Sequence, residues 1–221
     1  MSAQRQLDSS YVSVEEYYDI LLSGDIKYEW FNGMMWPVGN PDNLPQMMAG
    51  AQPEHNDIKN NIETRLSVQL EDGPCRVRSS DQQIKVEASE ILAFPDLTIV
   101  CEEARYETVR GLRTLLNPLV LIEILSPTTA NFDRDDKRAH YQLIPSLRDY
   151  LIVFCEQMRV EHFARQGDNS WLERIWTRPD DVVELSGVAA RLTMREIYRR
   201  IEFPQESSSR TPRVMMSNKA A

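Results

Sequence analysis

The chain has 221 residues, enough for one domain with a complete hydrophobic core, and no segment has the composition of an interdomain linker. Hydrophobic residues make up 42% of it, and no apolar run approaches the ~18 residues of a membrane-spanning helix, which excludes a membrane protein. The formal net charge of −9 argues against a protein that binds nucleic acid through its overall charge, so a nuclease function would have to rest on a local site.

The N-terminus and the cysteines indicate the compartment in which the protein works. Residues 1–10 contain no apolar stretch of the kind that a secretory signal needs, so we expect a cytoplasmic protein. The three cysteines, Cys75, Cys101 and Cys155, are widely separated, and the last two lie at the ends of apolar strand patterns. A reduced cysteine in such a place behaves as a small hydrophobic residue. We therefore expect neither a disulfide nor a zinc site.

A short helix and a hairpin are predicted near the start of the chain. Ser13 stands three residues before Glu16, a capping-box pattern that begins a helix, and Gly24 ends that helix. Residues 27–35 alternate irregularly around the dipeptide Asn32-Gly33, which is a strong turn signal. This segment is therefore predicted to form a β-hairpin.

The rest of the chain has the pattern of a mixed sheet with helices. A core helix is predicted at 54–70, where a single apolar stripe is formed by Ile58, Ile62, Leu66 and Leu70. Strands are predicted at 75–86, 94–101, 119–126 and 149–155, with a helix at 132–143. Because this helix lies between the last two of these strands, they should be parallel. Further short strands are predicted to extend the sheet as a meander, and a final helix follows them, at 160–164, 171–177, 182–185 and 191–201.

The chain is therefore expected to form a single domain over residues 11–203. Residues 1–10 should be flexible, and the tail 204–221 should be disordered. Within the domain, residues 37–53 contain four prolines, two glycines and two asparagines, which predicts a long surface loop. Loops of this length often act as lids or contact partners.

One carboxylate interrupts the most apolar strand of the chain. Glu123 lies in the middle of residues 119–126, on the same face of the predicted strand as Leu121 and Leu125. A buried and unpaired carboxylate costs several kcal/mol, so the fold should supply a cation, a metal or hydrogen-bond donors. A structural ion pair with Arg134 or Arg138 would meet this need as well as a metal would.

A second acid, Asp96, begins the preceding strand pattern. If the two strands pair, Asp96 and Glu123 can lie side by side, and a divalent metal relieves the repulsion between two such carboxylates. Mg²⁺ suits carboxylate oxygens and keeps positions open for phosphate, as in metal-assisted phosphodiester hydrolysis. Lys137, on the next helix, would assist by orienting water or neutralising charge. The alternative roles are a turn residue for Asp96 and a solvated lysine beside Asp133 for Lys137.

These segments together resemble a known family. The resemblance lies in Pro95-Asp96, in residues 119–129, in Asp133, Lys137 and Tyr141, and in residues 148–153. They are similar to the Uma-type family of putative restriction endonucleases, within the PD-(D/E)XK nuclease superfamily. Tyr28-Glu29, Asn32-Gly33 and His55 also look like its N-terminal signatures, so the resemblance spans roughly residues 13–155.

The resemblance implies an α/β fold with a restriction-endonuclease-like core, in the order α-β-β-β-α-β. The mixed sheet is flanked by helices, and here it has an extra N-terminal hairpin and C-terminal strands. It also implies that Asp96, Glu123 and the backbone carbonyl of Ile124 bind Mg²⁺, with Mn²⁺ as a substitute. DNA is the implied substrate, and a homodimer is expected, with residues 37–53 and the aromatic residues of the C-terminal strands as its interface.

The chain departs from the family pattern at two positions. The lysine of the (D/E)XK motif falls at Leu125, so the resemblance moves that role to Lys137. An acidic residue that usually follows the turn glycine is replaced by Met34. Glu29, His55 and Asp81 are possible accessory residues of the site.

Two other functions remain compatible with the sequence. A non-catalytic binding or dimerisation module that keeps the fold is favoured by the acidic charge and by Leu125. A hydrolase of a smaller phosphorylated substrate would tolerate the charge of −9 better than an enzyme acting on duplex DNA.

Overall fold

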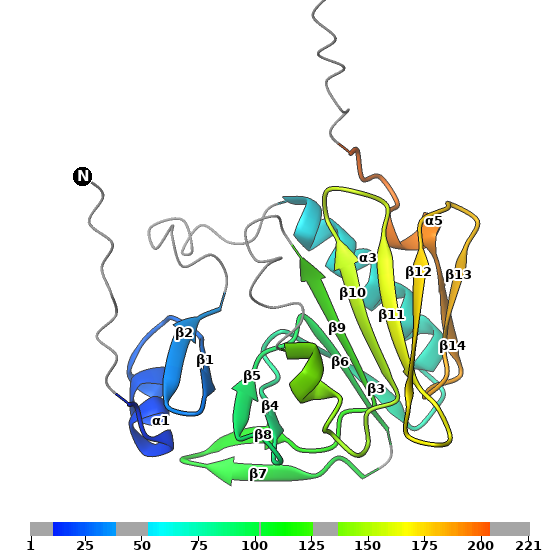
Figure 1. The fold of residues 1–221 in the computed structure, drawn as a ribbon. Helices are drawn as coiled ribbons and strands as arrows, with labels where there is room; N and C mark the ends of the chain where they lie inside the picture. Colours follow the sequence, from blue (N-terminus) through cyan, green and yellow to red (C-terminus); the bar gives the residue numbers. More distant parts are fainter. Residues whose placement is uncertain (1–10, 39–52, 102, 126–136, 204–221) are drawn as a thin grey trace, which may run out of the picture.

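Figure 1 shows the fold of the chain in a computed structural model, which describes residues 11–38, 53–101, 103–125 and 137–203. Both expected flexible ends lie outside the described residues, as do most of the expected surface loop and the first part of the helix expected at 132–143. In the described ranges the strands form two six-stranded sheets and one two-stranded sheet. No helix of these ranges is long and apolar enough to cross a membrane.

The first six-stranded sheet contains the expected core. Its spatial order is β12-β11-β10-β9-β6-β3. The strands are β3 (Cys75–Ser79), β6 (Leu97–Cys101), β9 (Val120–Leu125), β10 (Asp149–Phe154), β11 (Val160–Arg165) and β12 (Trp171–Trp176). Only β9 and β10 run parallel, as predicted, and the other neighbours are antiparallel. Helix α3 (Pro53–Leu70) crosses one face of this sheet (Figure 1).

Apolar side chains explain why these elements pack as they do. All six residues of β9 are buried, so this strand is enclosed on both faces. The predicted stripe of α3 is buried too, at Ile58, Ile62, Leu66 and Leu70, and it packs on the sheet. The order α3, β3, β6, β9, helical residues 137–141 and β10 is the predicted α-β-β-β-α-β core. The predicted restriction-endonuclease-like α/β fold is therefore confirmed.

The second six-stranded sheet holds the N-terminal hairpin, in the order β2-β1-β5-β4-β8-β7. Its strands are β1 (Tyr28–Phe31), β2 (Met34–Pro37), β4 (Ile84–Val86), β5 (Ile91–Ala93), β7 (Tyr106–Val109) and β8 (Leu112–Leu115). The hairpin is confirmed, and its turn residues Asn32 and Gly33 have φ of 46° and 85°, which suit a type I′ turn. The first helix, α1 (Val14–Ser23), begins with the predicted capping box of Ser13 and Glu16.

The boundaries of several other elements differ from those predicted. Residues 75–86 form two strands in different sheets, because the polar residues between β3 and β4 make a turn in which the Gln82 amide bonds to Ser79. The strand at 182–185, β13 (Val182–Leu185), does not extend the main sheet but pairs with β14 (Ala190–Thr193). The helix predicted at 191–201 is therefore wrong at both ends, because residues 191–193 belong to β14 and residues 198–200 form a turn. Only α5 (Met194–Ile197) is an α-helix there, and it begins at its Thr193 cap.

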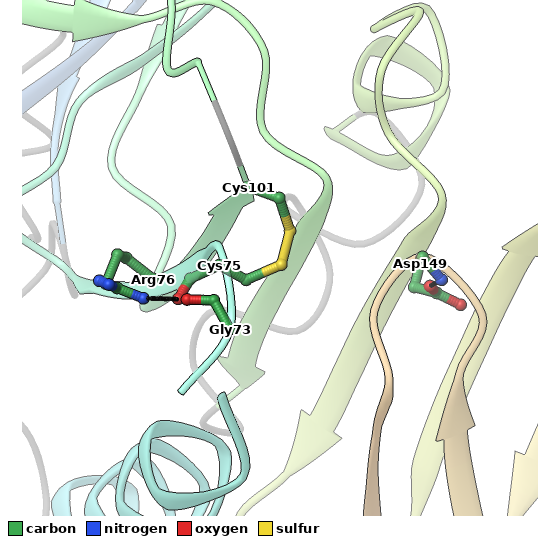
Figure 2. The surroundings of a disulfide bond; sticks show 6 residues. Gly73, Cys75, Arg76, Cys101 and Asp149 are labelled. Atoms are coloured by element: carbon green, nitrogen blue, oxygen red, sulfur yellow. Dashed lines mark hydrogen bonds between the residues drawn. A yellow bond between two sulfur atoms is a disulfide. The ribbon is translucent and has the colours of Figure 1, made fainter. Parts of the chain in front are cut away.

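The prediction that all cysteines are reduced is also wrong. Cys75 and Cys101 form a disulfide that joins β3 to β6 (Figure 2). They lie directly opposite each other in the antiparallel register of these strands, and this register brings their side chains onto the same face. Their separation of 26 residues in the sequence did not reveal this pairing. Cys155 remains a free, buried thiol.

Candidate active site

Asp96 directly precedes β6, and Glu123 lies in the neighbouring strand β9. These strands pair from Leu97, which lies opposite Ile122, so Asp96 stands one residue before the paired part of β6. The Asp96 carboxylate also accepts a hydrogen bond of 2.8 Å from the backbone amide of Ile124, the residue after Glu123. This hydrogen bond ties the Asp96 carboxylate to the strand that carries Glu123, although the side-chain partners of the two acids differ.

Glu123 is buried, and two side chains from one turn of a helix contact its carboxylate. Only 7% of the residue is exposed. The hydroxyl of Tyr141 donates to its Oε1 over 3.0 Å, and the Nζ of Lys137 lies 3.6 Å from the same oxygen. Burial, followed by the charge of Glu123, raises the pKa of Tyr141 well above its usual value, so the phenol stays a donor. Lys137 and Tyr141 are four residues apart and reach the same carboxylate because they share a helix face.

Lys137 is bound more closely by Glu29 than by Glu123. Its Nζ lies 2.8 Å from Oε2 and 3.0 Å from Oε1 of Glu29. The side chain of Glu29 is 4% exposed and that of Lys137 is 13% exposed, so the ion pair is largely shielded from water. The amine of the predicted catalytic lysine therefore points into the protein, between two buried carboxylates.

Glu29 is fixed by two further donors. The backbone amide of Phe94 donates to its Oε1 over 3.1 Å, and the indole of Trp36 donates to its Oε2 over 3.2 Å. Phe94 stands two residues before Asp96, and Trp36 lies on β2, directly opposite Glu29 in the hairpin. The hairpin therefore contributes a carboxylate to the site even though Met34 replaces the acid expected after its turn.

His55 contacts the other side of the site, at Asp96. Its Nε2 lies 3.1 Å from Oδ1 of Asp96, and both side chains are less than a fifth exposed. The Nδ1 of His55 is buried and has no hydrogen-bond partner among the residues that the structure describes. Because His55 lies in the first turn of α3, the packing of the apolar stripe on the sheet positions its ring.

The third accessory candidate, Asp81, lies at the margin of this group. It forms an ion pair with Lys27, whose hydrogen bond lowers the pKa of the Asp81 carboxyl, and its side chain is 82% exposed. Lys27 also lies 5.7 Å from the ring of Phe94. Asp81 therefore borders the site through Lys27 and does not join the buried cluster.

Sequence reasoning missed three contributions to this site: the hydroxyl of Tyr141, the indole of Trp36 and the amide of Phe94. One of them had a visible signal, because Tyr141 follows Lys137 at helix spacing. The Phe94 contact had none, because it depends on how β1 pairs with β5.

The donor atoms of the site suit a hard divalent cation. Carboxylate oxygens of Asp96 and Glu123, with a carbonyl such as that of Ile124 and water, are the ligands that Mg²⁺ prefers. The amine of Lys137 lies between two buried acids, so these three side chains together carry a net negative charge that a further cation would offset. In the described part of the chain, however, no three His, Cys, Asp or Glu side chains are close enough to hold a metal ion by themselves. An ion would thus depend on backbone and water ligands in addition to the two acids.

The site lies within the part of the chain that resembles known proteins. The sequence matches the Uma2 family, described as "Putative restriction endonuclease", over residues 14–195, a range that contains every site residue described above. It is 33% identical over 148 residues to the uncharacterized protein sll1609 of Synechocystis sp. (strain ATCC 27184 / PCC 6803 / Kazusa), which covers 66% of this chain and 76% of that protein. It is 25% identical over 192 residues to the uncharacterized protein slr1290 of the same organism, covering 87% of this chain and 94% of that one.

A solved structure shares the fold. It is the crystal structure of a "putative nuclease belonging to DUF820" from Anabaena variabilis ATCC 29413. The two superpose with a TM-score of 0.63 over 81% of this chain and 96% of that chain, at 15% sequence identity. At this identity the likeness shows the fold alone.

Proposed function

Because the chain belongs to the Uma2 family, described as "Putative restriction endonuclease", we propose that it is a metal-dependent endonuclease that hydrolyses phosphodiester bonds of DNA. The observation that carries the proposal is the grouping of Glu123 with the amine of Lys137, beside the segment that bears Asp96. A buried acid and a lysine meet here next to the backbone that binds the Asp96 carboxylate, which a structural ion pair alone would not require.

Each side chain has a defined part in the proposal. Asp96, Glu123 and the carbonyl of Ile124 would hold Mg²⁺, or Mn²⁺ in its place. The ion, when bound, would polarise the phosphate and lower the pKa of a bound water. Lys137 would offset the negative charge that develops on the phosphate oxygens. His55, through its contact with Oδ1, would hold the Asp96 carboxylate in position.

The family description and the charge balance guide the choice of substrate. We infer DNA as the substrate from the endonuclease description of the family. The net charge of −9 implies that DNA is bound by a local site and not by the charge of the whole surface. A homodimer and a cytoplasmic location, both expected from the sequence, stay predictions.

Each of the two alternative functions has observations in its favour. A non-catalytic module is favoured by Leu125 at the usual lysine position and by the pairing of Lys137 with Glu29. A hydrolase of small phosphodiesters is favoured by the acidic charge of the chain.

A cleavage assay on supercoiled plasmid tests the proposal. The full chain with Mg²⁺ or Mn²⁺ should convert the plasmid to nicked and linear forms, and EDTA should stop the reaction. Lys137→Ala should slow cleavage by about 100-fold or more. Lys85→Ala, which removes a lysine paired with Glu107 away from the site, should cleave at the wild-type rate.

Other results separate the rivals. Hydrolysis of bis(p-nitrophenyl) phosphate without any plasmid cleavage would favour the small-substrate hydrolase. No hydrolysis of either substrate would favour the non-catalytic module. Plasmid cleavage that Lys137→Ala leaves unchanged would contradict the site proposed here.

A further inference from the structure

Glu29 connects two halves of the site that come from distant parts of the chain. One half contains Glu123 and Lys137, and the other contains Asp96 with His55. Glu29 bonds the amine of Lys137 and also the backbone of Phe94, two residues before Asp96. We propose that Glu29 is a positioning residue, which holds the Lys137 amine and the Asp96 segment in one arrangement. The proposal rests on the nuclease function proposed above.

The contacts of Glu29 favour positioning over metal binding. A carboxylate has about four lone-pair sites for hydrogen bonds. Oε1 is contacted by Lys137 and by the Phe94 amide, and Oε2 by Lys137 and by the Trp36 indole. These four contacts fill the acceptor capacity of a side chain whose residue is only 3% exposed. A metal ion could bind Glu29 only if one of these donors were displaced.

The register of the strands explains why the Glu29 carboxylate reaches both halves. In the second sheet β1 pairs with β5, with Trp30 opposite Leu92. One step further along this register lies Glu29, next to the end of β5 and therefore beside Phe94. From Phe94 the chain runs directly to Asp96, whose Oδ2 is held by the amide of Ile124. The segment that carries Asp96 is thus tied to Glu29 at one end and to β9 at the other.

The unequal distances around Lys137 support the same conclusion. Its Nζ is 2.8 Å from Glu29 but 3.6 Å from Glu123. A cation that binds Glu123 can replace the weaker contact while Glu29 keeps the amine in place. Removing Glu29 should therefore release Lys137 even when the metal-binding acids are intact.

Chemical labelling of Lys137 tests this without any measure of activity. Lysines of the folded protein are acetylated with a limiting amount of acetic anhydride, and the rate at each lysine is read from peptide mass spectra. In Glu29→Gln, labelling of Lys137 should rise about tenfold, because its charge-assisted contacts are lost. The matched control is Glu107→Gln, which frees Lys85 from a 2.7 Å ion pair. It should raise labelling of Lys85 and leave Lys137 unchanged.

Metal binding and kinetics complete the test. Glu29→Gln should bind Mn²⁺ within about threefold of wild type and should lower kcat by about 10- to 100-fold with little change in KM. In the Lys137→Ala background the same substitution should have no further effect on kcat, because Glu29 acts through Lys137. If Glu29→Gln does not fold, the labelling is done with Glu29→Asp, whose side chain is shorter by one methylene group.

Two results would overturn the proposal. Unchanged Lys137 labelling in both Glu29 variants would show that Glu29 does not hold the amine. Loss of Mn²⁺ binding in Glu29→Gln would make Glu29 a metal ligand instead. If the wild type cleaves no DNA, the nuclease function fails, while the labelling and the Mn²⁺ titration still decide the role of Glu29.

Discussion

The Nζ of Lys137 lies 2.8 Å from Oε2 of Glu29, although the two residues are 108 positions apart in the sequence. Both side chains are largely buried, so neither charge can be removed without leaving the other one poorly solvated. The pair therefore links the stability of the fold to the chemistry of the site.

Removing only the lysine should destabilise the protein. Lys137→Met leaves the buried Glu29 carboxylate without its cation and should lower the free energy of unfolding by about 3 kcal/mol. The double variant Lys137→Met with Glu29→Gln should recover part of this loss, because position 29 then carries no unpaired charge. Urea denaturation measures both effects, with Lys85→Met as the control for loss of a lysine pair that is only partly buried. Equal stability of Lys137→Met and wild type would contradict the buried ion pair.

The cysteines make a second prediction that a thiol assay can check. The chain has three cysteines, of which Cys75 and Cys101 form the disulfide. Burial, with the nearby Asp96 charge, raises the pKa of Cys155 to about 12, so this thiol should be unreactive in the folded protein at pH 8. Unfolded protein without reductant should show one thiol, and three after reduction. Three thiols before reduction would disprove the disulfide.

Patterns within one element were readable from the sequence, and contacts between distant elements were not. The stripe of Ile58, Ile62 and Leu66, the turn at Asn32-Gly33 and the buried run around Glu123 each depend on local spacing, and all are present. Strands of three or four residues, such as β5, β7 and β8, are too short to show a period. The turn between β7 and β8 is also unusual, because Arg110 precedes Gly111 with a φ of 50°.

The same distinction applies to the site. Asp96, Glu123 and Lys137 were selected from their order along the chain and their resemblance to a family pattern. The bond between Glu29 and Phe94 depends on the pairing of β1 with β5, and the disulfide depends on the register of β3 with β6. Neither pairing can be derived from the spacing of residues within one segment.

The buried tyrosines predict how stability depends on alkaline pH. Burial raises the pKa of Tyr141 in the folded state, and it raises the pKa of Tyr17 and Tyr198 as well. In the unfolded chain these phenols ionise near pH ~10. Since the folded-state pKa values are the higher ones, the stabilisation is complete below this pH and is lost as the pH rises above it.

Absorbance of tyrosinate and circular dichroism, followed together, check this prediction. Tyr141, Tyr17 and Tyr198 should ionise only as the protein unfolds, so the last part of the absorbance change should coincide with loss of the dichroism signal. In the variant Tyr141→Phe, one tyrosine fewer should ionise in that step. Complete and reversible ionisation near pH ~10 with the fold intact would contradict the burial of these hydroxyls.

The most direct test of the account is calorimetric titration of the full chain with Mn²⁺. We predict binding to the wild type that is lost in Glu123→Gln and in Asp96→Asn, because each variant removes a carboxylate ligand. Asp180→Asn, which replaces an exposed acid paired with Arg195, should bind as the wild type does. Binding that persists in both site variants, or none in the wild type, would contradict the claim that Asp96 and Glu123 hold a catalytic metal ion.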